Sequence, residues 1–182
     1  MKQTPGDRQT VRIHHAAFRT ALGWVLIGAT ERGICFLQLA DSPANLRQKL
    51  AGEFPKAVIV NVPDALRPMF QRWVSALQAY LAGTSQLRGL PVDLRGTAFQ
   101  TLVWRYLLTV PSGEVRSYAD VAQAIGKPSA VRAVASACAR NRIALVIPCH
   151  RVIRGSGALA GYRWGVKRKR ALLDVERAFI ES

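Results

Sequence analysis

The sequence predicts an α+β protein in which a small α/β unit, residues 1–90, precedes a mostly helical unit, residues 91–182. Short apolar runs of strand length dominate the first unit, whereas the apolar residues of the second recur at helical spacing. Between the two lies a segment, residues 84–94, with the glycine and proline content of a linker. With 49% hydrophobic and 20% charged residues, the chain has the composition of a globular protein.

The first unit is expected to contain a hairpin, because two apolar segments flank a glycine-bearing turn at Gly33. Asp41 or Ser42 caps the next helix, and Pro43 occupies its first turn. The expected elements are strands at 22–28, 34–39 and 58–60 and helices at 41–53 and 63–81. Residues 1–10 are polar and are predicted to be frayed. We find no chemical motif in this unit and predict a supporting role for it.

The second unit is predicted to hold a helix-turn-helix. Thr97 caps a first helix, and two shorter helices, 117–125 and 130–140, are joined by the turn 126–129. Apart from Arg132 and a C-terminal arginine, the last of these helices has only small side chains, so it lacks the groups that read bases in the major groove. Two interpretations stay open. The small residues serve tight packing in the core, or they allow close approach to the minor groove with Arg132 free to enter the base stack.

The chain is strongly basic. Its 26 Lys and Arg against 11 Asp and Glu give a net charge of +15, and both halves share the excess. Such a charge favours polyanionic partners, nucleic acid first and an anionic membrane surface second. The densest basic run, residues 167–170, is either a solvated helix face or a phosphate contact.

Cysteine usage and the N-terminal sequence bear on compartment and cofactors. The 3 cysteines are widely spaced and form no CxxC pair, which argues against a zinc site and a disulfide framework. We therefore expect no metal and no cofactor. Residues 1–12 do not resemble a secretory signal, and no apolar run reaches membrane length. A cytoplasmic protein without a membrane partner is expected.

Cys149 is the strongest candidate for a reactive group. The apolar run 143–147 is predicted to be extended and to lead into Pro148, whose fixed φ places the thiol at a rigid, non-helical point. The adjacent His150, together with Arg151 and two further arginines, is expected to lower the thiol pKa and favour the nucleophilic thiolate. Equally, a lone cysteine after an apolar segment is often a core residue, and neighbours on an extended backbone point in opposite directions. The spacing alone leaves both interpretations open.

The residues around Cys149 form a longer pattern, Pro-Cys-His-Arg-Val-Ile, which closely resembles the O6-alkylguanine-DNA alkyltransferases, also called methylated-DNA–protein-cysteine methyltransferases. Further matching stretches are Arg95–Gln100, Gly126–Pro128, Ala130–Val134, Asn141 and Gly161–Gly165. The resemblance is strong over 91–176 and weaker over 11–90. It implies a ribonuclease H-like N-terminal domain and a winged helix-turn-helix-like C-terminal domain.

The resemblance also implies a role for each catalytic candidate. Cys149 would accept the alkyl group, His150 would act as a base through a water molecule, and Glu176 would be the carboxylate partner of His150. Asn141 would tie the helix pair to the active-site segment. Tyr118 would contact the phosphate beside the lesion and help to rotate the nucleotide out of the duplex.

On the DNA side, the resemblance implies that Arg132 occupies the gap left by the flipped base. The other residues expected to contact DNA are Lys127, Ala133, Ser136 and Tyr118. Those expected to line the guanine pocket are Tyr162, Val152, Trp164 and, through its backbone, Arg163.

The predicted function is repair of double-stranded DNA by a monomer bound in the minor groove. O6-alkylguanine, chiefly O6-methylguanine and also O4-methylthymine, would be flipped out, and Cys149 would take its alkyl group irreversibly. A single turnover is expected because the thioether is inert. Two alternatives remain: a cysteine hydrolase, which would need an oxyanion hole that no Gly-rich element beside the thiol supplies, and a non-catalytic lesion binder, which would need no thiol.

Overall fold

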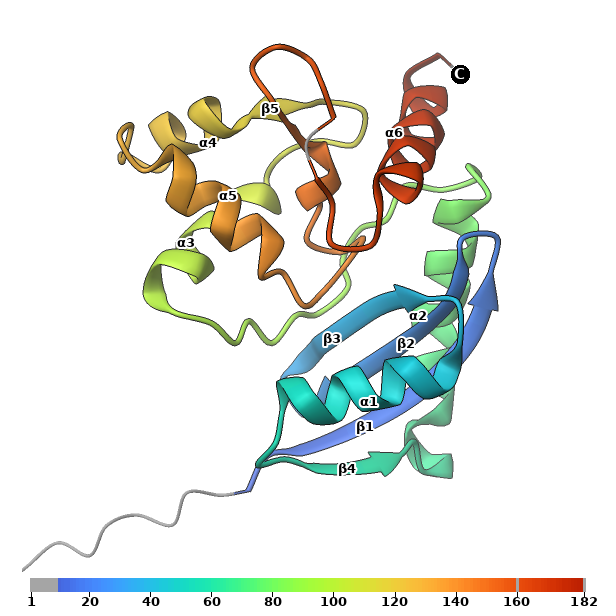
Figure 1. Ribbon diagram of the computed structural model, residues 1–182. Coiled ribbons are helices and arrows are strands. Elements are labelled where there is room, and N and C mark those ends of the chain that lie inside the picture. The colour runs from blue at the N-terminus through green and yellow to red at the C-terminus, as the bar shows by residue number, and fades with distance from the viewer. Residues whose placement is uncertain (1–9, 160, 182) are drawn as a thin grey trace, which may run out of the picture.

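The computed structural model describes residues 10–159 and 161–181, and it confirms the predicted α+β class (Figure 1). The first part of the chain folds into a four-stranded sheet with helices packed on it. Its elements are β1 (Arg12–Thr20), β2 (Gly23–Thr30), β3 (Gly33–Ala40), α1 (Pro43–Glu53), β4 (Val58–Asn61), the short 3-10 helix η1 (Asp64–Leu66) and α2 (Arg67–Leu81). The segment predicted to be frayed lies, except for Thr10, outside the described residues.

The sheet has the strand order β3-β2-β1-β4. β1, β2 and β3 pair antiparallel, whereas β4 runs parallel to β1. The predicted hairpin is β2–β3, and its turn holds Gly33 at φ +136, a conformation that residues with a side chain rarely adopt. Sequence patterning misses β1, because Ile13 is the single buried residue of that strand and polar residues interrupt any apolar run.

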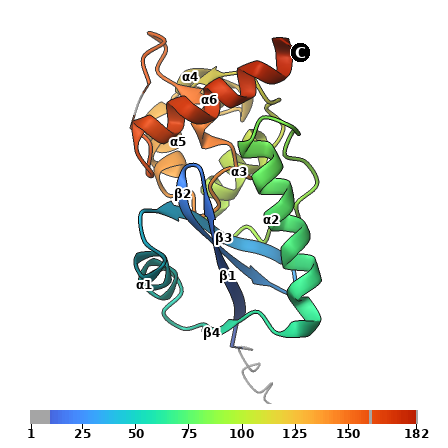
Figure 2. The same cartoon turned by 90° about the vertical axis from the view of Figure 1, so that its right-hand side faces the viewer.

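The helices α1 and α2 cover opposite faces of the sheet, as Figure 2 shows. Leu46 and Leu50 of α1 are fully buried in one apolar cluster with Phe36 of β3. Trp73 and Leu77 of α2 belong to a second, larger cluster. Burial of each such side chain stabilises the fold by about 1.5–3 kcal/mol. The sheet is therefore held between two apolar layers.

The second part of the chain is mostly helical, as predicted. Its elements are α3 (Ala98–Leu107), β5 (Arg116–Ser117), α4 (Tyr118–Ala124), α5 (Val131–Ala139), the 3-10 helix η2 (Cys149–Arg151), β6 (Val152–Ile153) and α6 (Val166–Glu181). Thr97 and Ser117 cap α3 and α4 through capping boxes. The two short strands, β5 and β6, pair in parallel. No helix in the described part of the chain is long and apolar enough to cross a membrane.

Replacing Ser117 with alanine is expected to lower the free energy of unfolding by about 1 kcal/mol, because the N–H of Asp120 loses the hydroxyl that accepts its hydrogen bond. Urea unfolding of the two proteins measures the difference. Ser117→Thr keeps a hydroxyl and should retain most of the stability. An alanine variant as stable as the threonine variant would show that this cap contributes nothing.

The outer edge of β3 joins the two parts of the chain. Ile34 bonds to the linker segment on one side. Farther along, the N–H of Leu37 donates to the carbonyl of Arg142 at 2.8 Å, and its carbonyl accepts from the N–H of Ala144 at 2.7 Å. These bonds satisfy backbone groups that an edge strand otherwise exposes. The sheet edge therefore supports the segment that leads to Cys149.

One prediction about the second part is wrong, and one interpretation holds for only part of its segment. The apolar run 143–147 is not an extended strand, because after one bridge to β3 it turns, with Leu145 at φ 67. Its apolar character reflects burial in the core rather than strand pairing. The basic run 167–170 is not a uniformly solvated face, because helical periodicity turns Lys169 inward. That residue is 1% exposed, and its Nζ donates to the carbonyl of Val152 at 2.5 Å.

Candidate active site

Cys149 follows a turn that Asn141 holds together. The side-chain nitrogen of this buried asparagine donates to the carbonyl of Ile147 at 3.0 Å and to Sγ of Cys149 at 3.1 Å. Its side-chain oxygen accepts the N–H of Ile143 at 2.8 Å. Because Asn141 lies just past the end of α5, one amide group connects the helix pair to the cysteine.

Cys149 is the first residue of η2, and so it does not lie at the non-helical point that the sequence predicts. The residue is buried, with 4% of its surface exposed. Burial raises the pKa of Cys149 to about 11, against the smaller opposing effects of the Asn141 hydrogen bond and the Lys169 charge. The expectation that the thiol pKa is lowered overall is therefore wrong for the protein without DNA, because burial outweighs the nearby cations. The thiol is protonated at neutral pH and needs a base to react.

His150, the next residue, is the candidate for that base. Its ring is fully buried, and Nε2 lies 3.0 Å from Oε1 of Glu176. Because an ionised carboxylate only accepts hydrogen bonds, Nε2 carries the hydrogen and Nδ1 keeps its lone pair. Nδ1 is buried and has no hydrogen-bond partner among the described residues. Burial lowers the pKa of His150 even though Glu176 opposes this, so the ring is neutral at pH 7.

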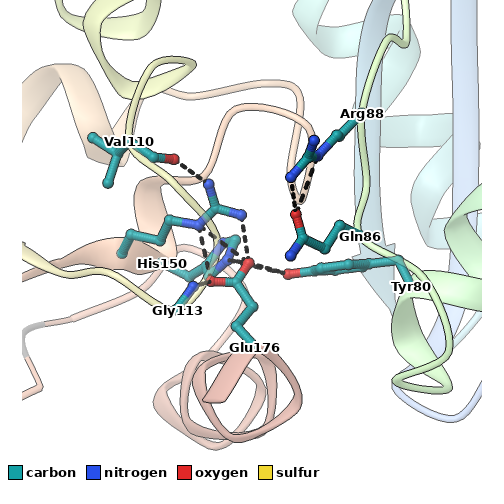
Figure 3. Close-up of polar contacts among 8 residues, drawn as sticks. Tyr80, Gln86, Arg88, Val110, Gly113, His150 and Glu176 are labelled. Atoms are coloured by element: carbon teal, nitrogen blue, oxygen red, sulfur yellow. Dashed lines mark hydrogen bonds and ion pairs between the residues drawn. The ribbon is translucent and has the colours of Figure 1, made fainter. Parts of the chain in front are cut away.

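Glu176, on α6, receives hydrogen bonds from several sides (Figure 3). Arg151 donates to both carboxylate oxygens, from Nε to Oε2 at 2.9 Å and from Nη2 to Oε1 at 2.6 Å. The N–H of Gly113 donates to Oε2 at 3.1 Å. Burial would raise the pKa of Glu176, but the hydrogen bonds and charges of His150 and Arg151 hold it well below its usual range. The carboxylate is therefore ionised and fixed in place.

Arg151 belongs to the buried polar cluster around Glu176. The sequence predicts that it makes the surroundings of the thiol electropositive, but it does not. Its side chain is 10% exposed, and Nη1 donates to the carbonyl of Val110 at 2.5 Å. Glu176 and Val110 thus engage the guanidinium, whose charge stabilises the carboxylate. The prediction fails because successive side chains in a 3-10 turn point about 120° apart.

Tyr80 of α2 also reaches the cluster, although sequence reasoning finds no chemistry in the first part of the chain. Its hydroxyl donates to Oε1 of Glu176 at 2.5 Å and lies 3.3 Å from Nε2 of His150. The sequence signal is weak: Tyr80 continues the apolar face formed by Trp73 and Leu77, where a buried hydroxyl requires a partner. The first part of the chain thus contributes a polar group to the site.

The helix pair exposes four of the five residues that the sequence predicts to contact DNA. They are Lys127 in the turn and Arg132, Ala133 and Ser136 on α5. The opposite face of α5 is buried, and the carbonyl of Ala137 there accepts the indole N–H of Trp104 at 2.9 Å. Small residues therefore allow tight packing on one face of α5 and leave few large side chains on the other.

Tyr118 begins α4 and is half-buried. Burial raises the pKa of Tyr118 to about 12, and Cys138 and Cys149 act in the same direction. The phenol is therefore protonated at neutral pH.

Three of the residues assigned to the guanine pocket lie close to the cluster. The hydroxyl of Tyr162 is buried and has no partner among the described residues. The Tyr162 ring meets the His150 ring edge-on, with 6.5 Å between centroids, and the Trp164 ring at 5.0 Å. Val152 and Trp164 are both buried. This aromatic group forms an apolar wall beside the histidine.

The fourth pocket candidate, Arg163, directs its side chain elsewhere. Its guanidinium forms an ion pair with Glu53 of α1 and donates to the carbonyl of Asn141 at 3.0 Å. Glu53 also pairs with Arg142 at 2.5 Å. The Arg163 side chain therefore connects α1 with the segment around the cysteine.

The arrangement as a whole allows Cys149 to act as a nucleophile once a neutral imidazole takes its proton. Asn141 contacts the thiol and lies just past the end of α5. This one residue therefore connects the candidate nucleophile with the helix whose other face is exposed. Fold and site define a class of α+β proteins in which a helix-turn-helix domain carries a cysteine backed by a histidine–glutamate pair.

Comparison with known proteins identifies the family. Residues 13–94 match the family model for the ribonuclease-like domain of 6-O-methylguanine DNA methyltransferase. Residues 98–178 match the family model for the DNA binding domain of the same protein. The chain belongs to the 6-O-methylguanine DNA methyltransferase family.

Individual relatives agree with this assignment. The bifunctional transcriptional activator/DNA repair enzyme Ada of Escherichia coli is 49% identical over 96% of this chain and 48% of its own length. The inducible methylated-DNA–protein-cysteine methyltransferase of Bacillus subtilis is 38% identical over 83% of each chain. The crystal structure of Mycobacterium tuberculosis OGT in complex with DNA superposes with a TM-score of 0.76 at 36% identity, covering 91% of this chain and 93% of that one. The chain spans about half the length of the Ada proteins that it matches.

Proposed function

We propose that the protein repairs DNA by transferring the alkyl group of O6-alkylguanine, chiefly O6-methylguanine, to Cys149. O4-methylthymine is a second substrate in this proposal. The observation that carries it is a buried thiol that accepts a hydrogen bond from Asn141 and is followed by a neutral base, His150. The family of the chain and its Ada relative, a DNA repair enzyme, support the same chemistry.

In the proposed step, Sγ of Cys149 attacks the methyl carbon in line with its bond to O6. His150 accepts the thiol proton at Nδ1 through an intervening water molecule as the S–C bond forms. The bond between the methyl carbon and O6 breaks. Its electron pair stays on the guanine, which takes up a proton. The hydroxyls of Tyr118 and Tyr162 are the candidates to deliver that proton, because burial raises the pKa of each and keeps it protonated at neutral pH. No cofactor takes part.

The product is a thioether, which neither His150 nor another group described in the cluster can hydrolyse. Each molecule is therefore expected to act once, with Cys149 as a consumed reactant. A hydrolase would instead regenerate its thiol, and repeated turnover of a thioester would indicate that alternative.

The proposed partner is double-stranded DNA, bound through the minor groove by α5. Its exposed residues Ala133 and Ser136 leave room for close approach, and Lys127 contacts phosphate. Arg132 enters the stack where the alkylated base leaves it. The net charge of +15 supports binding to a polyanion whatever its sequence.

We further propose that residues 91–182 bind DNA and accept the alkyl group, while residues 1–90 support them through the β3 edge and α2. A monomer suffices, because every residue of the proposed site comes from one chain. The cytoplasm is the proposed place of action, since a reducing compartment keeps Cys149 as a free thiol.

The proposal is tested by incubating the protein with a duplex that contains O6-methylguanine and measuring intact and peptide masses. We expect a gain of about 14 Da, the mass of CH₂, on the peptide that holds Cys149, saturating at one methyl group per molecule. Unmodified duplex is the control. Transfer to another peptide, or continued turnover, would contradict the mechanism.

Replacing Arg132 with alanine is expected to slow methyl transfer from duplex DNA by about a hundredfold, because the gap left by the flipped base is no longer filled and the cost of unstacking is not offset. Single-turnover kinetics measure the effect. Alkylation by free O6-methylguanine base should be unchanged, since no base is flipped. Arg140→Ala, at the exposed end of the same helix, is the matched control for charge. Equal losses on duplex and free base would contradict the assigned role.

A further inference from the structure

We propose that Tyr80, which reaches the site from α2, is a positioning residue for alkyl transfer: its hydroxyl holds Glu176 and His150 in the arrangement that leaves Nδ1 free. This inference rests on the proposed function and deepens it. It also makes the active site a product of both parts of the chain.

The geometry is a closed triangle of polar atoms (Figure 3). The hydroxyl of Tyr80 donates to Oε1 of Glu176 at 2.5 Å. The same carboxylate oxygen faces Nε2 of His150 at 3.0 Å, and Nε2 lies 3.3 Å from the Tyr80 oxygen. All three side chains are fully buried, with 0% exposure. Bulk solvent therefore does not reach any side of the triangle.

The triangle decides the tautomer of the imidazole. Because the Tyr80 proton is directed at Glu176, the phenol oxygen presents a lone pair toward Nε2. Both neighbours of Nε2 are then acceptors, and a hydrogen on Nε2 satisfies them together. A hydrogen on Nδ1 would leave Nε2 facing two oxygens with no proton between them. Tyr80 thereby adds to Glu176 in keeping Nδ1 as the basic nitrogen.

The Tyr80 hydroxyl also weakens the effect by which the Glu176 carboxylate raises the pKa of His150. A donor on Oε1 withdraws negative charge from the oxygen that faces Nε2, so it favours the neutral ring. The titratable or charged groups that face His150 come from α2, η2, α6 and the loop before α6, and they are Tyr80, Arg151, Lys169, Glu176 and Tyr162. Among these, burial and the two cations lower the pKa of His150, and Glu176 raises it.

The ring of Tyr80 is held independently of its hydroxyl. It stacks on Phe179 of α6, with 6.2 Å between centroids and 29° between planes. Replacing Tyr80 with phenylalanine keeps this packing and removes the oxygen alone. The two contributions of the side chain, packing and hydrogen bonding, can therefore be measured separately.

The test compares Tyr80→Phe with the wild-type chain in two assays. In single-turnover transfer from O6-methylguanine duplex, the variant should be about tenfold slower at pH 7.5. The loss should be greater at pH 6 than at pH 8, because the pKa of His150 rises when Oε1 loses a donor and more of the base is protonated. In the second assay, nitrogen-15 NMR of the free protein reports the tautomer and titration of His150 without any DNA.

Phe179→Leu is the matched control, since it weakens the ring contact and keeps the hydroxyl. It should lower the thermal midpoint yet leave the pH profile and the His150 titration as in the wild type. A Tyr80→Phe variant with wild-type titration and wild-type rates would overturn the inference, as would a rate loss with the same pH profile. A wild-type chain that transfers no methyl group would instead overturn the proposed function, and the NMR assay distinguishes that case because it needs no transfer.

Discussion

Replacing Cys149 with serine is expected to abolish methyl transfer while leaving DNA binding intact. A serine hydroxyl is a far weaker nucleophile than a thiolate, and His150 is too weak a base to ionise it. We expect the single-turnover rate to fall below about one thousandth of the wild-type value. The binding surface on α5 is unaffected, because Asn141 can donate to the serine oxygen in place of Sγ.

Two measurements separate these outcomes. Peptide mass after incubation with O6-methylguanine duplex measures transfer, and fluorescence anisotropy measures affinity for the same duplex. Cys35→Ala is the matched control, because that thiol is buried in β3, burial raises its pKa to about 12, and it lies outside the site. It should transfer one methyl group as the wild type does. A methylated Cys149→Ser protein, or loss of transfer in Cys35→Ala, would contradict the assignment of the acceptor.

Replacing Glu176 with glutamine is expected to cause the largest loss of stability, about 3 kcal/mol at pH 7. The change keeps the shape of the side chain but removes the charge that Arg151 faces at 2.6 Å. The side chain of Arg151 is 10% exposed, so its cation is left without a counter-ion in a poorly solvated place. Transfer should slow as well, because the amide no longer fixes the hydrogen of His150 on Nε2.

The pH dependence of stability gives this prediction a second test. Because the pKa of Glu176 is lowered in the folded protein, its contribution is fully present above the carboxyl pKa of the unfolded chain, about 4.3, and is lost as the pH falls below it. The difference between wild type and Glu176→Gln should therefore shrink as the pH is lowered from 7 toward 3. Urea unfolding at several pH values measures it.

Glu53→Gln is the control for an ion pair at the surface. Glu53 pairs with Arg142 and Arg163, but its side chain is 20% exposed and those of the arginines are about 30% exposed. Solvent screening limits such pairs to about 1 kcal/mol or less. If Glu176→Gln lost no more stability than Glu53→Gln, the buried cluster would not be the stabilising feature that its geometry indicates.

Much of the fold follows from local sequence signals. The helix starts at Ser42, Thr97 and Ser117 are set by side chains that bond to backbone N–H groups three positions away. The hairpin turn at Gly33 likewise needs a residue that tolerates positive φ. Such interactions span a few residues, and a sequence displays both partners together. β1 is missed because its burial is slight and its alternation is masked by polar residues.

The same distinction between local and long-range interactions applies to the site. The proposed acceptor could be identified from the sequence, because Pro148, Cys149 and His150 are neighbours in a specific motif. The thiol pKa could not, because burial of Cys149 outweighs every nearby charge, and burial is a property of the assembled core. The direction of the Arg151 side chain could not be predicted either, because it depends on a 3-10 turn. The apolar run that precedes this turn indicates an extended backbone instead.

The sequence by itself determined the α+β class, the helix caps and the residue that is proposed to accept the alkyl group. Only the tertiary structure decided which groups surround Glu176. Tyr80 lies 96 positions away in the chain from this carboxylate, and no local pattern connects them. Their contact exists because the packing of α2 against α6 brings two buried polar groups together where each must find a partner.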